Sequence, residues 1–266
     1  MDLFHPIIGA NWKMNKTLAE SISTACSLVN LLDRLDDRTV FINVPYTCLL
    51  AVKDIFHQAG ILVGAQNVFW EDWGAYTGEI SASMLKDLGI DIAMVGHSER
   101  RTLFSETDMI INQKLRALLR NGLLPVLCIG EPLDVRVSKC TEAYLTNQLI
   151  QDLEGVQRKD FEHLIIAYEP IWAIGSGLSL DPTDAEETHT FIRKKVTDLL
   201  GEQIEKHIHI IYGGSINTTN AAELAKMSNV DGLYVGGASL NAYTFAQIVY
   251  WDKPAFSQVR RISQNN

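Results

Sequence analysis

Three side chains that can move or stabilise protons stand at the ends of separate apolar runs in the sequence: Lys13, His97 and Glu169. A Lys supplies positive charge, a His donates or shuttles a proton, and a Glu can abstract one. Each alone is a weak signal, because such residues at the end of an apolar run are more often solvated or structural groups. Together, with no metal-ligand spacing around them, they favour acid–base chemistry.

Two glycine pairs add a second feature. Gly213 and Gly214 precede Ser215, and Gly236 and Gly237 follow another apolar run. Glycine lets the backbone approach an anion closely, although tight turns also require it for their own geometry. Two pairs after neighbouring runs favour a phosphate site.

An apolar, glycine-containing segment follows Glu169 directly. An exposed apolar loop leaves apolar surface in contact with water unless it closes over a bound molecule, so we interpret this segment as a lid. The lid residues are Pro170, Ile171, Trp172, Ala173, Ile174, Gly175, Ser176 and Gly177.

The elements that must position these groups alternate regularly along the chain. Nearly continuous apolar runs, typical of strands buried on both faces of a parallel sheet, cover residues 7–13, 40–45, 61–66, 92–97, 124–130, 163–169, 207–214 and 232–237. Helical patterns lie between them, and Thr17 with Glu20, like Thr183 with Glu186, has the spacing of a capping box.

An eightfold strand–helix alternation of this length predicts a single-domain α/β fold, a closed (β/α)8 barrel of the TIM type over residues 1–251, with a short polar tail at 252–266. A doubly wound open sheet is less favoured, because no GxGxxG turn follows an early strand. Function in such a barrel lies at the carboxyl ends of the strands, where Lys13, His97 and Glu169 stand.

Composition limits the possible partners. The chain has 266 residues, is 47% hydrophobic and carries a net charge of −9, so nucleic acid and anionic membranes are poor partners. The start of the chain has no pattern of a signal peptide and no run is long enough to span a membrane. The cysteines (Cys26, Cys48, Cys128 and Cys140) have no CxxC spacing, which favours reduced thiols and a cytoplasmic location.

Several long, ordered segments resemble the triosephosphate isomerase family over residues 5–250. They are GANWKMN (9–15), VGAQN (63–67), GAYTGEIS (74–81), MLKDLG (84–89), GHSERR (96–101), CIGE (128–131), AYEPIWAIGSG (167–177), YGGS (212–215) and VGGASL (235–240). The resemblance implies a cofactor-free isomerase of glycolysis and gluconeogenesis. It would interconvert dihydroxyacetone phosphate and D-glyceraldehyde 3-phosphate through an enediolate.

The resemblance also implies a role for each site residue. Lys13 would stabilise the oxyanion, His97 would polarise the carbonyl, and Glu169 would carry a proton between C1 and C2. A Glu base paired with a neutral His is a known property of this family. The implied substrate-binding residues are Asn11 and, through their backbone N–H groups, Gly175, Ser215, Gly236 and Gly237.

Further residues would support the site. Glu99, paired to Lys13, and Cys128 would lie behind the reacting groups. Thr77 would reach into the neighbouring subunit of a homodimer.

Some positions depart from the usual family pattern. Tyr234 stands where a Leu is usual, next to the lid residue Ile174, and Pro132 replaces a Thr. Two alternatives therefore stay open. The chain could be an isomerase for a tetrulose phosphate or a similar ketose phosphate, or a barrel that has lost catalysis and serves in binding or regulation.

Overall fold

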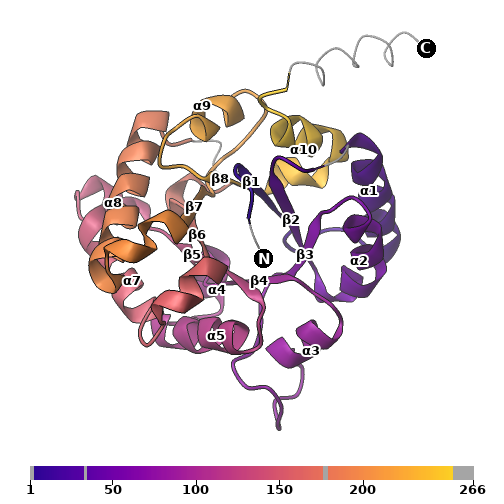
Figure 1. Ribbon diagram of the computed structural model, residues 1–266, viewed down its shortest axis with the longest axis horizontal. Coiled ribbons are helices and arrows are strands. Elements are labelled where there is room, and N and C mark those ends of the chain that lie inside the picture. The colour runs from indigo at the N-terminus through magenta and orange to yellow at the C-terminus, as the bar shows by residue number, and fades with distance from the viewer. Residues whose placement is uncertain (1–2, 33–34, 176–178, 254–266) are drawn as a thin grey trace.

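The computed structural model describes residues 3–32, 35–175 and 179–253, and these residues form a closed barrel of parallel strands in the order β1 to β8 (Figure 1). The predicted (β/α)8 barrel is thus confirmed, and the open sheet is excluded. The strands are β1 Ile7–Asn11, β2 Thr39–Val44, β3 Leu62–Ala65, β4 Ile92–Val95, β5 Leu124–Ile129, β6 Ile165–Tyr168, β7 His209–Tyr212 and β8 Gly232–Val235.

Helices surround the strands as an outer ring (Figure 1). They are α1 Leu18–Leu31, α2 Leu49–His57, α3 Ala82–Asp87, α4 Ser98–Leu103, α5 Asp108–Arg120, α6 Leu133–Val137, α7 Thr141–Asp152, α8 Pro182–Leu200, α9 Ala221–Ala225 and α10 Ala242–Val249. Short 3-10 turns occur at η1 Tyr46–Cys48, η2 Arg158–His163, η3 Ile171–Ala173, η4 Glu202–His207 and η5 Gly237–Leu240. Within the described ranges, no helix has the length and apolar character needed to cross a membrane.

One of the two predicted capping boxes is present in the structure, and the other is not. Thr17 and Glu20 form the predicted capping box of α1, each side chain bonding the other's backbone N–H. The second predicted box is wrong. Asp181 caps α8 instead, accepting a hydrogen bond from the Thr183 N–H at 2.9 Å, because Pro182 is suited to the first helical position. Glu186 bonds Asn229.

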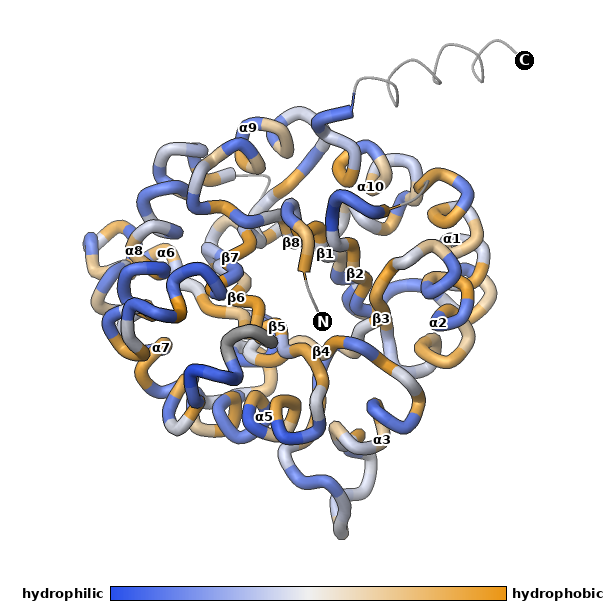
Figure 2. The backbone as a smooth tube through the Cα atoms, viewed as in Figure 1, coloured by the Kyte–Doolittle hydropathy of each residue, from blue (hydrophilic) through white to orange (hydrophobic). Residues whose placement is uncertain are grey.

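Apolar side chains fill two layers. One lies between the strands and the surrounding helices, and the other fills the barrel interior with side chains that include Phe41, Met94 and Tyr234. Figure 2 shows many hydrophobic residues along the strands and many hydrophilic residues in the outer loops. Strands that are buried on both faces explain the nearly continuous apolar runs of the sequence.

The beginning of the predicted tail packs against the barrel. The buried guanidinium of Arg38 donates to Asp252 at 3.0 Å, and Lys253 pairs with Asp37 at 2.7 Å. Residues 254–266 lie outside the described residues, so a tail at 252–266 stays a prediction.

Candidate active site

Lys13, His97 and Glu169 meet at one cavity of about 430 Å³ at the carboxyl ends of the strands. Each follows its strand by one or two residues, since β1 ends at Asn11, β4 at Val95 and β6 at Tyr168. The cavity is lined by Asn11, Lys13, His97, Glu169, Ile174, Gly175, Gly213, Gly214, Ser215, Ile216, Tyr234, Gly236, Gly237 and Ala238.

One carboxylate oxygen of Glu169 accepts no hydrogen bond from the described residues. The residue is only 3% exposed, and its Oε2 has no hydrogen-bond partner among the described residues. Its Oε1 lies 3.6 Å from Nε2 of His97. Gly213 makes room for the side chain, because a Cβ there would lie 2.7 Å from Cγ of Glu169. A buried oxygen left free in a cavity is suited to accept a proton from a bound molecule.

The electrostatic surroundings of Glu169 increase its basicity. Burial raises the pKa of the carboxyl group above its usual value, and the nearby His97 and Lys13 partly offset this effect. The nearby Cys128 thiol also lowers the pKa of Glu169, by less than His97 or Lys13 does. Burial raises the pKa of that thiol too, so Cys128 stays protonated behind Glu169. Desolvation of the carboxylate therefore dominates.

The start of α4 orients the His97 ring through a backbone hydrogen bond. The backbone N–H of Glu99 donates to Nδ1 of His97 at 3.2 Å, so Nδ1 carries no proton. This hydrogen bond assigns the ring proton to Nε2, which faces Glu169. A neutral Nε2–H can donate a hydrogen bond to a carbonyl oxygen and accept its proton back.

Lys13 supplies the positive charge of the cavity. Its Nζ lies 2.6 Å from Oε1 of Glu99, so the predicted pair is present in the geometry. The backbone of Lys13 adopts a φ of +52°, an unusual conformation for a side-chain-bearing residue that costs about 1–3 kcal/mol. Its N–H donates to Oδ1 of Asn11 at 2.9 Å, so Asn11 helps to hold that conformation.

The predicted phosphate-binding residues line the same cavity: Gly175, Ser215, Gly236 and Gly237. A Cβ at Gly237 would meet no atom within 4 Å, and one at Gly236 would approach only Cε of Lys13 at 3.7 Å. These glycines therefore leave open space beside backbone N–H groups. Gly214 serves a different purpose, since a Cβ there would lie 2.0 Å from the Tyr212 hydroxyl.

The predicted lid is anchored where it leaves Glu169. The Ile171 N–H donates to the Glu131 carbonyl at 3.0 Å, and Nε1 of Trp172 donates to the buried Glu131 carboxylate at 3.2 Å. Trp172 is half-buried against the core and is not an exposed residue of a free loop. Glu131 belongs to the CIGE segment at 128–131, but its role as an anchor could not be derived from the sequence. Ile174 and Gly175 reach the cavity, whereas Ser176 and Gly177 lie outside the described residues.

The raised pKa of Glu169 predicts a pH dependence. Because the base must be ionised to abstract a proton, kcat/KM should fall as the pH drops through the pKa of Glu169 in the free protein. Burial places this acid limb above about 4.3, the value of an unperturbed Glu. The pH profile of kcat/KM measures the limb directly. An acid limb at or below the unperturbed value would contradict a desolvated base.

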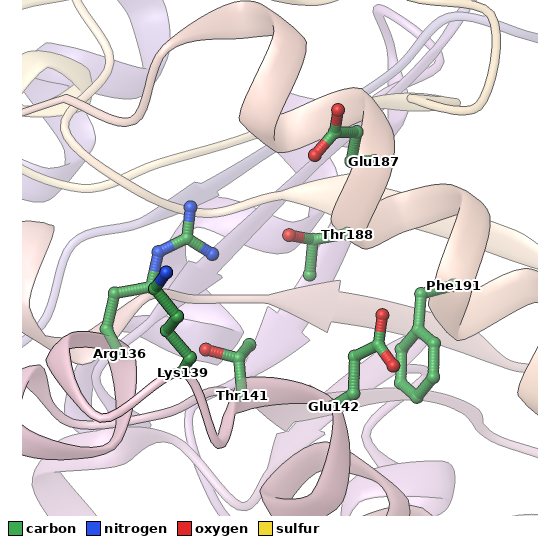
Figure 3. A pocket seen from close by; sticks show the side chains of 7 residues that line it. All are labelled: Arg136, Lys139, Thr141, Glu142, Glu187, Thr188 and Phe191. Carbon is green, nitrogen blue, oxygen red and sulfur yellow. The ribbon is translucent and has the colours of Figure 1, made fainter.

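A second cavity, of about 410 Å³, lies on the outside of the barrel between α6, α7 and α8 (Figure 3). Arg136 and Lys139 balance Glu142 and Glu187 in its lining, so the cavity favours no ligand charge. The predicted site residues do not line it. In the part of the chain that the structure describes, no group of three or more His, Cys, Asp or Glu residues is arranged to hold a metal ion.

Comparisons with known proteins agree with this geometry. Residues 6–251 match the family model described as triosephosphate isomerase. The chain is 42% identical to a triosephosphate isomerase of Dictyoglomus thermophilum over 91% of this chain and 98% of that protein. It is 44% identical to one of Moorella thermoacetica over 93% and 99% of the two chains. The crystal structure of triosephosphate isomerase from Bartonella henselae is similar with a TM-score of 0.83, at 38% identity over 93% and 99% of the two chains.

Proposed function

Because the chain belongs to the triosephosphate isomerase family, it is an aldose–ketose isomerase, and we propose that Lys13, His97 and Glu169 carry out its proton transfers. The reaction interconverts dihydroxyacetone phosphate and D-glyceraldehyde 3-phosphate. The observation that carries the assignment of residues is the free, buried Oε2 of Glu169 in a cavity shared with His97 and Lys13.

The chemistry follows from the three groups. Glu169 takes a proton from the carbon next to the carbonyl, and the electron pair of that C–H bond moves into an enediolate. The charge develops on oxygen, where the ammonium of Lys13 and the Nε2–H of His97 stabilise it. His97 moves a proton between the two oxygens, and Glu169 returns its proton to the neighbouring carbon. Since the proton leaves and returns on one carboxylate, the residues present complete the reaction.

The glycines in the lining of the cavity support the proposal that it binds the phosphate group of the substrate. Backbone N–H groups of Gly175, Ser215, Gly236 and Gly237 would hold the phosphate oxygens. The 3-10 turn η5 begins at Gly237, directly after β8. In barrels of this type, phosphate sites commonly form after strands seven and eight.

One comparison of kcat/KM between substrates distinguishes a triose phosphate isomerase from a tetrulose phosphate isomerase and from a barrel without catalysis. The parent protein should convert D-glyceraldehyde 3-phosphate with a higher kcat/KM than a tetrulose phosphate. The Tyr234 hydroxyl is bonded to Asn43 and lies against Met94, neither of which lines the cavity, so it is not free to recognise a longer substrate. A higher value for the tetrulose phosphate would favour the paralogue, and no turnover of either compound would favour a binding protein.

The loop between β3 and α3 supports an assembly of two chains. It projects from the barrel beside α3 (Figure 1). Trp73 in this loop is 83% exposed, and Met14, in the segment that follows β1, is 96% exposed. Thr77 is also exposed. Exposed aromatic and apolar side chains of this size mark contact surfaces, and symmetric homodimers are the commonest assembly. A homodimer in which Thr77 enters the partner would cover them.

If the protein is a homodimer, a substitution in this loop should lower the mass of the particle in solution. Trp73→Asp should convert a dimer into a monomer at micromolar concentration, because a carboxylate would be buried without a partner. Sedimentation measures the mass. Val137→Asp is the matched control, since Val137 on α6 is 73% exposed and lies outside the loop. A parent protein that sediments as an active monomer at micromolar concentration would contradict the dimer.

The cysteines support a reducing compartment. All of them are free, and Cys26 and Cys140 are exposed. Exposed thiols of this kind stay reduced in a cytoplasm, where the isomerase would serve glycolysis and gluconeogenesis.

A further inference from the structure

A buried tyrosine in the interior of the barrel forms part of the lining of the active-site cavity. Tyr234 on β8 is 3% exposed, and its ring packs against Phe41 on β2 with 5.6 Å between ring centres. Gly9 on β1 makes room for both rings, because a Cβ there would lie 2.6 Å from the Tyr234 ring. The Tyr234 hydroxyl lies 2.9 Å from Oδ1 of Asn43 and 2.9 Å from Sδ of Met94. It has one proton to donate, and the amide oxygen is the stronger acceptor.

Hydrogen bonds connect Asn43 to the segment that carries Lys13. The Asn43 side chain donates from Nδ2 to the Ala65 carbonyl at 2.8 Å, so both ends of its amide are engaged. Its backbone carbonyl accepts hydrogen bonds from the Trp12 N–H at 3.1 Å and from Nε2 of Gln66 at 3.2 Å. Nε2 of Gln66 also donates to the Lys13 carbonyl at 2.9 Å.

Side chains hold both polar groups of the Lys13 backbone. Gln66 binds the carbonyl, and Asn11 accepts from the N–H at 2.9 Å. The Asn11 amide in turn lies 3.8 Å from Sδ of Met94, the sulfur that the Tyr234 hydroxyl contacts. A residue with a φ of +52° keeps that conformation only where its surroundings hold it there. Two sets of contacts therefore connect the Tyr234 hydroxyl to the Lys13 backbone. One runs through Asn43 and Gln66, and the other runs through Met94 and Asn11.

We propose that Tyr234 is a positioning residue for Lys13, acting through its hydrogen bond to Asn43. The hydroxyl fixes the Asn43 side chain, and Asn43 holds Trp12 and Gln66, so that the Lys13 ammonium stays where the oxyanion forms. Tyr234 itself exchanges no proton. This inference rests on the proposed role of Lys13 and adds to it a residue of β8, the strand that pairs with β1.

The test is a double-mutant cycle between Tyr234 and Lys13. Tyr234→Phe keeps the ring and removes the hydroxyl, and it should lower kcat/KM for D-glyceraldehyde 3-phosphate about tenfold. In a Lys13→Ala background, the same change should have no further effect, because the group being positioned is gone. Tyr234→Phe should also leave the acid limb of the pH profile unchanged, since the base Glu169 is not its target.

A matched control separates this role from a loss of stability. Ser21→Ala removes another buried hydroxyl, which donates to Sγ of Cys48 at 3.2 Å away from the cavity. It should keep the parent kcat/KM at a melting temperature similar to that of Tyr234→Phe. A crystal structure of Tyr234→Phe should show a changed backbone at Lys13.

The inference is wrong if the effects of Tyr234→Phe and Lys13→Ala multiply, if the acid limb moves, or if Tyr234→Phe keeps the parent kcat/KM. A parent protein without isomerase activity would overturn the proposed function instead. The structure of Tyr234→Phe would then still decide the inference, since an unchanged Lys13 would contradict it.

Discussion

Replacing Glu169 with Gln should lower kcat by roughly 10²–10⁴-fold, because the amide keeps the shape of the side chain but cannot accept a proton. Glu169→Asp should cost on the order of 10²-fold, since the shorter side chain withdraws the carboxylate by about 1 Å. Steady-state kinetics with D-glyceraldehyde 3-phosphate measure both losses. Activity within a factor of two of the parent in either variant would mean that another group is the base.

The stability of Glu169→Gln distinguishes lost chemistry from lost folding. Burial raises the pKa of Glu169 in the folded state above its unfolded value of about 4.3. The folded protein then binds more protons than the unfolded chain in this window, so the carboxyl group lowers stability as the pH rises through it. Glu169→Gln removes the ionisation and should melt at a higher temperature than the parent at neutral pH. The difference should disappear below the unfolded pKa.

Cutting the lid should change the product as well as the rate. An enediolate next to a phosphate ester can break its C–O bond, so that the electron pair leaves with inorganic phosphate and the remaining enol becomes methylglyoxal. A lid that grips the phosphate through the Gly175 N–H keeps this bond near the enediolate plane and excludes water. Replacing residues 172–177 by a short glycine link should therefore lower isomerisation sharply and raise phosphate release per turnover.

Both products can be assayed on the same truncated variant. Pro170 and Ile171 remain in it, so the hydrogen bond between the Ile171 N–H and the Glu131 carbonyl is retained. Glu169, His97 and Lys13 are unchanged and can still form the enediolate. If isomerisation falls while the ratio of phosphate to product stays at the parent value, the lid has a function other than protecting the intermediate.

The barrel could be predicted from the sequence because each strand is buried on both faces. That burial produces short, nearly continuous apolar runs at regular spacing, and the groups that end those runs must gather at one rim. Lys13, His97 and Glu169 could be placed at one rim for that reason. Local signals were less dependable, as the misassigned start of α8 shows. Pro182 and Asp181 determined that helix start, and the pattern of Thr183 with Glu186 did not.

Contacts between residues that are far apart in the chain could not be derived from the sequence. Nothing in the order of residues shows that Tyr234 on β8 donates a hydrogen bond to Asn43 on β2, or that Gly213 leaves space for Glu169. Glycines illustrate the difficulty, because the same residue type leaves open space at Gly237 and allows close packing at Gly214. The physical reason for each glycine depends on its neighbours in space.

The central claim is that Glu169 moves a proton between two carbons through an enediolate. The most direct measurement is turnover of dihydroxyacetone phosphate in D₂O, followed by NMR of the glyceraldehyde 3-phosphate formed. A carboxylic acid exchanges its proton with solvent, so the product should carry carbon-bound deuterium at C2. Glu169→Gln should lose both the turnover and the deuterium. Full turnover by the parent protein with no carbon-bound deuterium would contradict the account, because the hydrogen would then move without visiting an exchangeable base.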